Sequence, residues 1–305
     1  MVGKSFQSAR IEYQSFCALV NGKSQDFAVF YGKTGKPPAP QSLFRRIAAE
    51  IAGISQFSVR HKVNRQRAVL LRFISDVLDE LITLFPSPYI HIGGDEASKA
   101  AWKSCPLCQK RMKEEGLKDV DELQSYLIHR MERFLNEHGR SLLGWDEILQ
   151  GGLAPNATVM SWRGEQGGID AVLSGHHAIM TPGEYCYFDS YQDAPYSQPE
   201  AIGGYLPLEK VYSYNPVPDS ISADKQDFIL GVQANLWAEY IPTDEHMEYM
   251  LYPRAIALSE VAWTAPEKKS WDSFHERILK IIPVLKEKGY NTFDYAKEIG
   301  NRKEY

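Results

Sequence analysis

The sequence predicts an α/β fold of the (β/α)8-barrel type. From about residue 67 onward, strand-like segments alternate with helical segments, an order typical of parallel sheets. The expected strands have almost uniformly apolar cores, as in sheets that are buried on both faces. Clusters of polar residues follow the ends of these strands, where barrels of this type carry their active sites. With 305 residues, the chain is long enough for one such barrel.

The first expected elements are two helices and the strand between them. Apolar side chains recur at helical spacing over residues 67–85, and Pro86 follows as a stop. A buried strand is expected in "YIHIGGDE", residues 89–96. The next helix is expected from Asp121 to His138, because Asp119 and the residues after it are typical of a capping box.

The later segments continue the same alternation. Further strands are expected in "SLLGWDEI", "ATVMSWRG", "HAIMTPG" and "FILGVQANLWAE", with a short helix in "GIDAVLSG". Two helices are expected to close the chain, one around Met247–Trp263 and one over Trp271–Lys288 that is interrupted by Pro283.

Residues 1–66 differ from the rest of the chain. They contain a Pro/Gly-rich stretch, "GKTGKPPAPQS", and only "DFAVFYG" resembles a strand. A full barrel needs three βα units before residue 89, each of roughly 25 to 30 residues, and only one and a half fit. We therefore expect an atypical segment over 1–66, as a remnant or irregular closure, and a barrel over 67–305 that is incomplete or irregular in its first three strands.

Charge and composition exclude several classes of partner. The net charge is −5, from 34 basic and 39 acidic residues without long runs, which argues against nucleic acid or an anionic membrane surface. No stretch reaches the roughly 18 apolar residues of a membrane span, and the first residues lack the apolar core of a signal peptide. Cys105 and Cys108 form a lone C-x-x-C, so we expect thiols that are reduced or incidentally paired. No metal or other cofactor is expected.

The adjacent carboxylates Asp95 and Glu96 are the strongest candidate site. Neighbouring side chains of a regular strand point to opposite faces, so the pair can cooperate only where the strand becomes irregular. Gly93 and Gly94 give the backbone that freedom. Two close carboxylates repel, which favours one protonated group that can act as a general acid. The structural alternative is that the pair caps the helix that follows.

Five motifs in order, "HIGGDE", "GWDEI", "SWRG", "YFD" and "ANLWAE", resemble glycoside hydrolase family 20, the β-N-acetylhexosaminidases. The resemblance runs from about Phe73 to Tyr290. It implies an exo-acting hydrolase that removes terminal β-linked N-acetylglucosamine or N-acetylgalactosamine from glycans. It also implies a retaining, substrate-assisted mechanism through an oxazolinium-like intermediate. For full-length relatives it implies a periplasmic, extracellular or lysosomal location.

The same resemblance implies a role for each site residue. Glu96 would be the general acid and later the base, and Asp95 would orient the acetamido N–H of the substrate. Tyr187 would donate a hydrogen bond to the acetamido oxygen. The walls of the pocket and the groups that bind sugar hydroxyls would be Trp145, Trp162, Trp237, Asp189 and Glu239.

Several alternatives stay open at this point. Trp145 and Trp162 could be core aromatics, and His91 is more simply a core histidine than a ligand. The front strands of the family normally carry an arginine and a Pro-Gly-His segment, and neither occurs in residues 1–72. A second hypothesis is therefore a truncated, impaired relative that at most binds N-acetylated sugars. A third, an ordinary double displacement by Glu96 and Glu239, predicts cleavage of glucosides without the acetamido group. The sequence predicts no oligomeric state.

Overall fold

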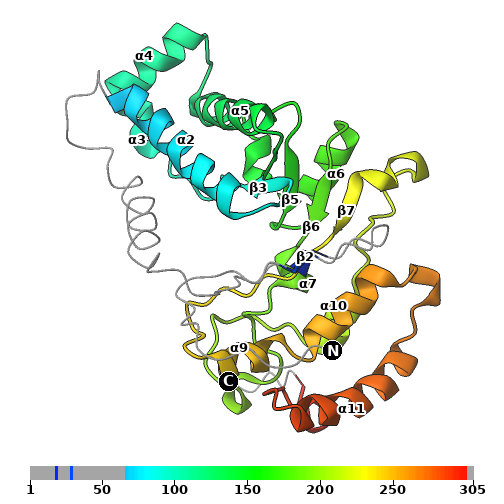
Figure 1. Cartoon of the computed structure of the whole chain (residues 1–305). Coiled ribbons are helices and arrows are strands. Elements are labelled where there is room, and N and C mark those ends of the chain that lie inside the picture. Colours follow the sequence, from blue (N-terminus) through cyan, green and yellow to red (C-terminus); the bar gives the residue numbers. More distant parts are fainter. Residues whose placement is uncertain (1–17, 20–27, 30–65, 301–305) are drawn as a thin grey trace. The chain divides into compact units, whose positions relative to one another are not determined.

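The computed structural model describes residues 18–19, 28–29 and 66–300 of the chain (Figure 1). The chain divides into two compact units. One, the β3–β5 unit, comprises residues 35–160 and 170–177. The other, the β6–β7 unit, comprises residues 1–34, 161–169 and 178–305. The atypical segment expected over 1–66 lies almost wholly outside the described residues.

The predicted α/β class is confirmed by a five-stranded parallel sheet in the order β3-β4-β5-β6-β7. Parallel strands with intervening helices are the repeating unit of a (β/α)8-type barrel. Each strand lies inside a segment predicted from its apolar core. The strands are β3 (Tyr89–His91), β4 (Ser141–Trp145), β5 (Thr158–Ser161), β6 (Ala178–Met180) and β7 (Ile229–Val232).

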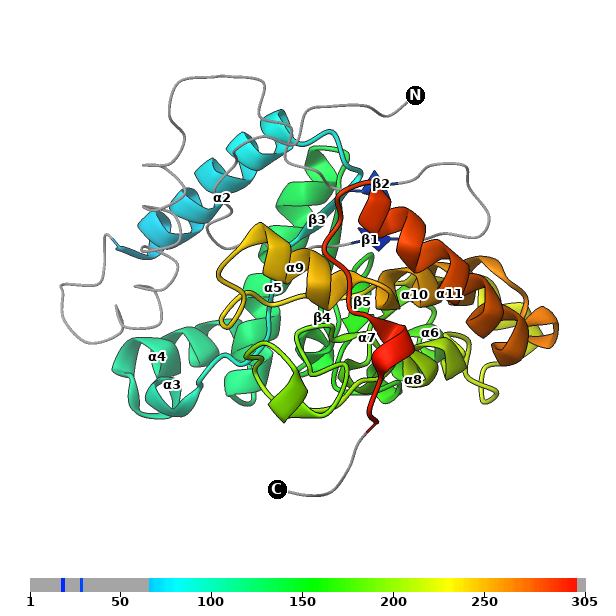
Figure 2. The ribbon, with the colours of Figure 1, turned by 90° about the horizontal axis from the view of Figure 1, so that it is seen from below.

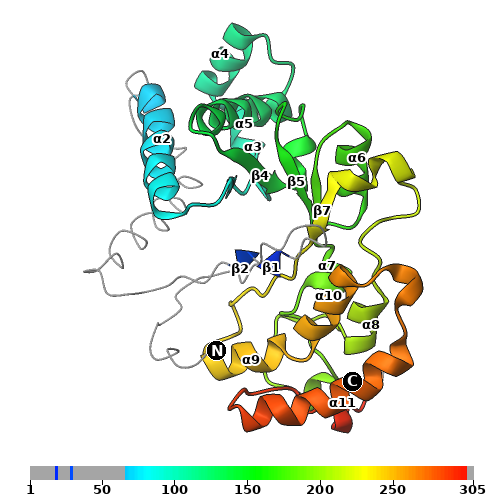
Figure 3. The same cartoon turned by 45° about the vertical axis from the view of Figure 1, so that its right-hand side comes forward.

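Among the described residues, four α-helices lie wholly within the β3–β5 unit. The elements are α2 (Gln66–Leu84), α3 (Ala100–Ser104), α4 (Pro106–Glu115) and α5 (Val120–Glu137). Helix α5 packs against β4, as Figure 3 shows. It begins as predicted, because the Asp119 side chain accepts hydrogen bonds from the backbone N–H groups of Asp121 and Glu122.

The expected buried strand over residues 89–96 is much shorter than predicted. Within β3 only Ile90 is buried, and His91 is exposed. Among the described residues β3 pairs with β4 alone, so it lies at an edge of the sheet. Gly93 and Gly94 then take φ of 75° and 100°, which ends the extended backbone. His91 is accessible at the end of this short strand, yet burial of its ring lowers its pKa to about 4, so its interpretation as a neutral core histidine rather than a ligand stays a prediction.

The β6–β7 unit holds a contiguous apolar core. Its apolar side chains come from both strands and from the helices that follow, among them Met180, Phe188, Val232, Leu258, Phe274 and Ile278. The helices are α7 (Gly183–Cys186), α8 (Leu208–Ser213), α9 (Asp244–Leu251), α10 (Arg254–Trp263) and α11 (Trp271–Glu287). Helix α8 packs against both α10 and α11 (Figure 2). Helix α6 (Gln166–Leu173), also predicted, has residues in both units.

The two closing helices differ from the prediction, in each case at a proline. The single helix expected around Met247–Trp263 is broken into α9 and α10 at Pro253, which has no N–H to continue the first helix. Conversely, α11 runs through Pro283 without interruption. Its buried face, formed by Phe274, Ile278 and Ile282, ends just before the exposed proline. Burial of this face outweighs the one hydrogen bond that the proline cannot donate.

Two short strands precede the main sheet. Strand β1 (Ala18–Leu19) pairs with β2 (Ala28–Val29) in an antiparallel ladder. The expected strand in "DFAVFYG" contains β2, whereas β1 was not predicted. Within the described residues no helix is both long enough and apolar enough to cross a bilayer.

Candidate active site

The loop after β3 presents Asp95 and Glu96 to solvent. Glu96 adopts a φ of 45°, a left-handed conformation that is unfavourable for a residue with a Cβ atom. It follows two glycines with positive φ, so the chain turns over at this point. Both carboxylates are exposed, and neither has a hydrogen-bond partner among the described residues. The strained backbone at Glu96 and the exposure of both carboxylates leave this loop accessible to a ligand.

Helix α5 and the loop after β4 hold this acidic loop at both ends. Gln124 Nε2 donates to the carbonyl oxygen of Gly94 at 2.8 Å. At the other end, Lys99 Nζ lies 2.5 Å from Asp121 Oδ1 and 2.8 Å from Gln150 Oε1. Sequence reasoning missed Gln124 and Lys99 as supporting residues. Their contacts span 30 and 22 residues of sequence, which no local pattern shows.

Trp145 ends β4 next to the acidic loop. Its backbone N–H donates to the carbonyl oxygen of Gly93 at 3.0 Å. Its largely buried indole meets the His91 ring edge-on at 4.8 Å between centroids. His91 Nδ1 in turn accepts the Gly93 N–H at 3.0 Å, so this nitrogen carries no proton. In the β3–β5 unit the structure thus brings Trp145 together with the loop of Asp95 and Glu96.

The second acidic pair, Asp146 and Glu147, is buried. Both residues lie in the 3-10 turn Asp146–Leu149 that follows β4. Their burial makes them supporting residues rather than groups that face a ligand. Nearby, Ile148 fills the space above Gly94.

In the β6–β7 unit an aromatic cluster surrounds Tyr187. The Trp162 indole stacks on the Tyr187 ring with 6.2 Å between centroids and 22° between planes. The Trp237 indole packs against the same ring at 6.4 Å and 52°. All three side chains are partly exposed. The interpretation of Trp162 as a core residue is therefore not supported, since its ring belongs to an accessible aromatic cluster.

Polar side chains at the ends of β6 and β7 fix the backbone at Tyr187. Asn235 exchanges backbone hydrogen bonds with Cys186 and Phe188 on either side of the tyrosine, at 2.8 and 2.7 Å. The buried Asn235 side chain donates from Nδ2 to Thr181 Oγ1 at 2.7 Å. Asn235 lies inside the "ANLWAE" motif, yet sequence reasoning assigned it no role.

Asp189 follows Tyr187 and is 5% exposed. Its Oδ1 is buried without a hydrogen-bond partner among the described residues. The pKa of Asp189 is raised to about 6, chiefly by burial and slightly by the carboxylate of Glu239. The hydrogen bond from its own backbone N–H and the positive charge of Arg254 act in the opposite direction. Glu239 itself is exposed, beyond Trp237. A buried carboxylate oxygen without a donor is satisfied when a hydroxyl reaches it.

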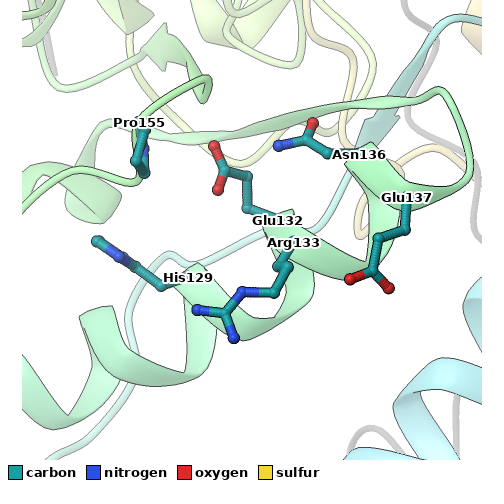
Figure 4. Close-up of a pocket in the computed structure, with 6 residues that line it drawn as sticks. All are labelled: His129, Glu132, Arg133, Asn136, Glu137 and Pro155. Carbon is teal, nitrogen blue, oxygen red and sulfur yellow. The ribbon is translucent and has the colours of Figure 1, made fainter.

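A separate cavity of about 410 Å³ lies along α5 in the β3–β5 unit (Figure 4). Five of its lining residues project from that helix, and Pro155 comes from a separate loop. The lining residues are His129, Glu132, Arg133, Asn136, Glu137 and Pro155. None of the predicted site residues lines it. It also lacks an aromatic wall, so it is a poor match for a sugar ring.

No metal site emerges in the part of the chain that the structure describes. No three His, Cys, Asp or Glu side chains converge there as metal ligands would. Cys105 and Cys108 flank Pro106 at the start of α4 and form no disulfide.

Comparison with known proteins decides the family. Residues 45–266 match the model of glycosyl hydrolase family 20, catalytic domain. The chain belongs to this family. A β-hexosaminidase of Porphyromonas gingivalis is 57% identical over 210 residues, which cover 68% of this chain and 27% of that protein. A β-hexosaminidase of Vibrio furnissii is 39% identical over 193 residues, covering 62% and 31%.

Solved structures of family 20 enzymes agree with the fold. A Vibrio harveyi exo-β-N-acetylglucosaminidase in complex with N-acetylglucosamine superposes with a TM-score of 0.66 at 33% identity. It covers 72% of this chain, and the chain covers 35% of that structure. A Bacteroides fragilis β-N-acetylhexosaminidase gives a TM-score of 0.64 at 29% identity, covering 73% and 46%. The chain thus spans less than half the length of these relatives and carries part of a family 20 glycoside hydrolase domain.

Proposed function

We propose that the chain acts as an exo-β-N-acetylhexosaminidase, which removes a terminal β-linked N-acetylhexosamine from a glycan by a retaining, substrate-assisted mechanism. The observation that carries the proposal is the cluster in the β6–β7 unit. There the Tyr187 ring packs with both Trp162 and Trp237, and Asp189 in the same unit keeps an unpaired buried oxygen. We assign the catalytic barrel to residues 67–305 and an irregular closing segment to 1–66.

The cluster suits an N-acetylated sugar. Aromatic faces pack well on the apolar face of a sugar ring and on the acetamido methyl group. The Tyr187 hydroxyl can donate to the acetamido oxygen, and the Asp189 carboxylate can accept from a ring hydroxyl. Glu239, whose charge reaches Asp189, is the second acceptor for hydroxyls.

The acidic loop supplies the proton transfers. Glu96 gives its proton to the glycosidic oxygen while the acetamido oxygen of the substrate attacks the anomeric carbon and the glycosidic bond breaks. Asp95 accepts the acetamido N–H and stabilises the positive charge of the oxazolinium. Glu96 then takes a proton from water, which opens the ring with overall retention. Intramolecular attack of this kind can lower a barrier by about 7 to 11 kcal/mol.

Three features support this assignment. Asp95 and Glu96 are exposed and unpaired among the described residues, as groups that meet a substrate must be. Trp145 lies beside their loop. Trp145 is the last residue of β4, and the other site residues come after the carboxyl ends of parallel strands, the position of active sites in (β/α)8 barrels.

A second candidate is the impaired relative that only binds N-acetylated sugars. Among the described residues β3 has no partner strand on its outer side, and the only strands before it are the short β1 and β2. If β3 has no partner on that side in the whole protein, the loop that carries Glu96 would be less rigidly placed. A less rigidly placed Glu96 lowers the rate of hydrolysis more than the affinity for the sugar.

One experiment separates these candidates. The purified 305-residue chain is assayed on 4-nitrophenyl N-acetyl-β-glucosaminide and on the plain glucoside, beside Glu96→Gln and the control Glu137→Gln on the exposed face of α5. Substrate-assisted hydrolysis requires activity on the acetamido substrate alone, a loss of about 10²- to 10⁴-fold in Glu96→Gln, and no change in the control. Equal cleavage of the plain glucoside would favour double displacement. Binding of N-acetylglucosamine without turnover would favour the impaired relative.

A further inference from the structure

Arg254, the first residue of α10, is completely buried in the β6–β7 unit. We propose that Arg254 is a positioning residue that fixes the Phe188–Ser190 segment and so aims the Asp189 carboxylate at the sugar. The inference rests on the proposed function, because it assigns Asp189 to substrate binding. It concerns contacts that lie wholly within one unit of the chain.

The Arg254 guanidinium is saturated by backbone carbonyl groups. Its Nη1 donates to Ser190 O at 3.0 Å and to Leu206 O at 3.1 Å. Its Nη2 donates to Phe188 O and, at 2.6 Å, to Met250 O, which also accepts from Nε at 3.2 Å. The guanidinium thus makes five hydrogen bonds to four carbonyl groups, which uses the full donor capacity of arginine.

Two of these carbonyl groups flank Asp189. Phe188 and Ser190 are its immediate neighbours, and both are held by the same rigid fork. The Phe188 ring also packs beneath the guanidinium, with 5.0 Å from Cζ to the ring centroid. The Phe188 carbonyl belongs to the peptide group that precedes Asp189, and the Ser190 carbonyl to the second peptide group after it. Holding both restricts the directions that the Asp189 Cα–Cβ bond can take. Arginine suits this task because its planar donors are fixed relative to one another, whereas a lysine offers a single nitrogen.

The charges point to the same relationship. A fully buried arginine normally has a carboxylate partner, yet Arg254 makes no ion pair among the described residues. Asp189 is the foremost negative group acting on it. Burial lowers the pKa of Arg254 to about 9, so the group remains positive at neutral pH. The positive charge of Arg254 lowers the pKa of Asp189, whereas burial raises it. Arg254 therefore restrains the direction of that carboxylate and lowers its pKa against the larger effect of burial.

The test compares Arg254→Lys with Arg277→Lys in the full chain. Arg277 is the matched control because it makes a bidentate pair with Glu260, at 2.6 and 2.7 Å, on a more exposed surface. Two readouts are taken: kcat and KM on 4-nitrophenyl N-acetyl-β-glucosaminide, and the titration of the Asp189 carboxyl by carbon NMR, assigned with Asp189→Asn. We expect Arg254→Lys to raise KM by about tenfold, with kcat within about threefold, a loss of ground-state binding. We also expect Asp189 to titrate at higher pH, and neither change in Arg277→Lys.

The outcomes are separable. A folded Arg254→Lys protein with unchanged KM and unchanged Asp189 titration would make Arg254 a purely structural residue and overturn the inference. If Arg254→Lys does not fold, Phe188→Leu removes only the ring beneath the guanidinium and must move both readouts in the same direction. If the unmodified chain neither binds nor hydrolyses the substrate, the proposed function fails. The Asp189 titration still tests its relationship to Arg254 in that case.

Discussion

Lys99 Nζ lies 2.5 Å from Asp121 Oδ1 and ties the acidic loop to the first turn of α5. The ammonium also donates to Gln150 Oε1, so one largely buried cation joins three segments of the β3–β5 unit. Glu96 lies three residues before it, in a left-handed conformation. The loop can keep that unfavourable backbone only because its ends are held.

Replacing Lys99 should therefore loosen the acidic loop. The Lys99 side chain is 14% exposed, so Lys99→Met leaves Asp121 without its partner in a partly buried site. We expect a loss of about 1 to 2 kcal/mol in the free energy of unfolding, between the values typical of exposed and of buried pairs. The measurement is urea unfolding followed by circular dichroism. The control is Lys110→Met, whose pair with Glu114 at 3.5 Å is exposed and should cost less than about 0.5 kcal/mol. Equal effects of the two variants would show that Lys99 makes an ordinary surface pair.

Gly94 should not tolerate a side chain. It has a φ of 100°, and a Cβ atom added there would lie 2.7 Å from Ile148 Cγ2. Gly94→Ala therefore forces a disfavoured backbone conformation and displaces a fully buried isoleucine. Together these effects should lower the free energy of unfolding by about 3 kcal/mol or more. Gly116→Ala is the matched control, since Gly116 has a φ of 69° with no atom within 4 Å of the added Cβ. It should lose only about 1 to 2 kcal/mol. Urea unfolding of both variants measures the difference, and similar losses would mean that Ile148 moves aside at little cost.

The sequence predicted the alternation of elements well but not how the site is supported. Apolar periodicity and caps are local signals, so α5 with its Asp119 cap was predicted almost to the residue. Short motifs likewise identified Tyr187 and Trp237, which the structure brings into contact. Lys99, Gln124 and Arg254 were missed, because their partners lie 22, 30 and up to 66 residues away. Pro283 shows the same limit, since tertiary burial of α11 overrides a local helix breaker.

Asp189 should make stability depend on pH in a defined direction. Its pKa is raised from 3.8 to about 6 in the folded protein, chiefly by burial. The folded state therefore binds this proton more tightly than the unfolded state between about pH 4 and pH 6. Stability must fall as the pH rises through that window, by about 2 kcal/mol for a shift of this size. Asp189→Asn should remove the pH dependence that this carboxyl causes. The variant should then be more stable than the unmodified chain at pH 7 but not at pH 4. Urea unfolding at both pH values tests this, and a variant with an unchanged pH dependence would contradict it.

The thiols should differ sharply in reactivity. Cys186 is fully buried, and burial raises its pKa well above the ordinary value, so almost no thiolate forms at neutral pH. Cys105 and Cys108 are half-buried at the start of α4 and form no disulfide. The thiolate is the reactive species, and a helix N-terminus favours it. In a Cys17→Ser background at pH 7.5, a chromogenic disulfide reagent should therefore modify two thiols quickly in the native protein. The third should react only on unfolding in urea, and Cys186→Ser should remove that slow phase alone. A rapid third equivalent in the native state would show that the core around Cys186 opens readily.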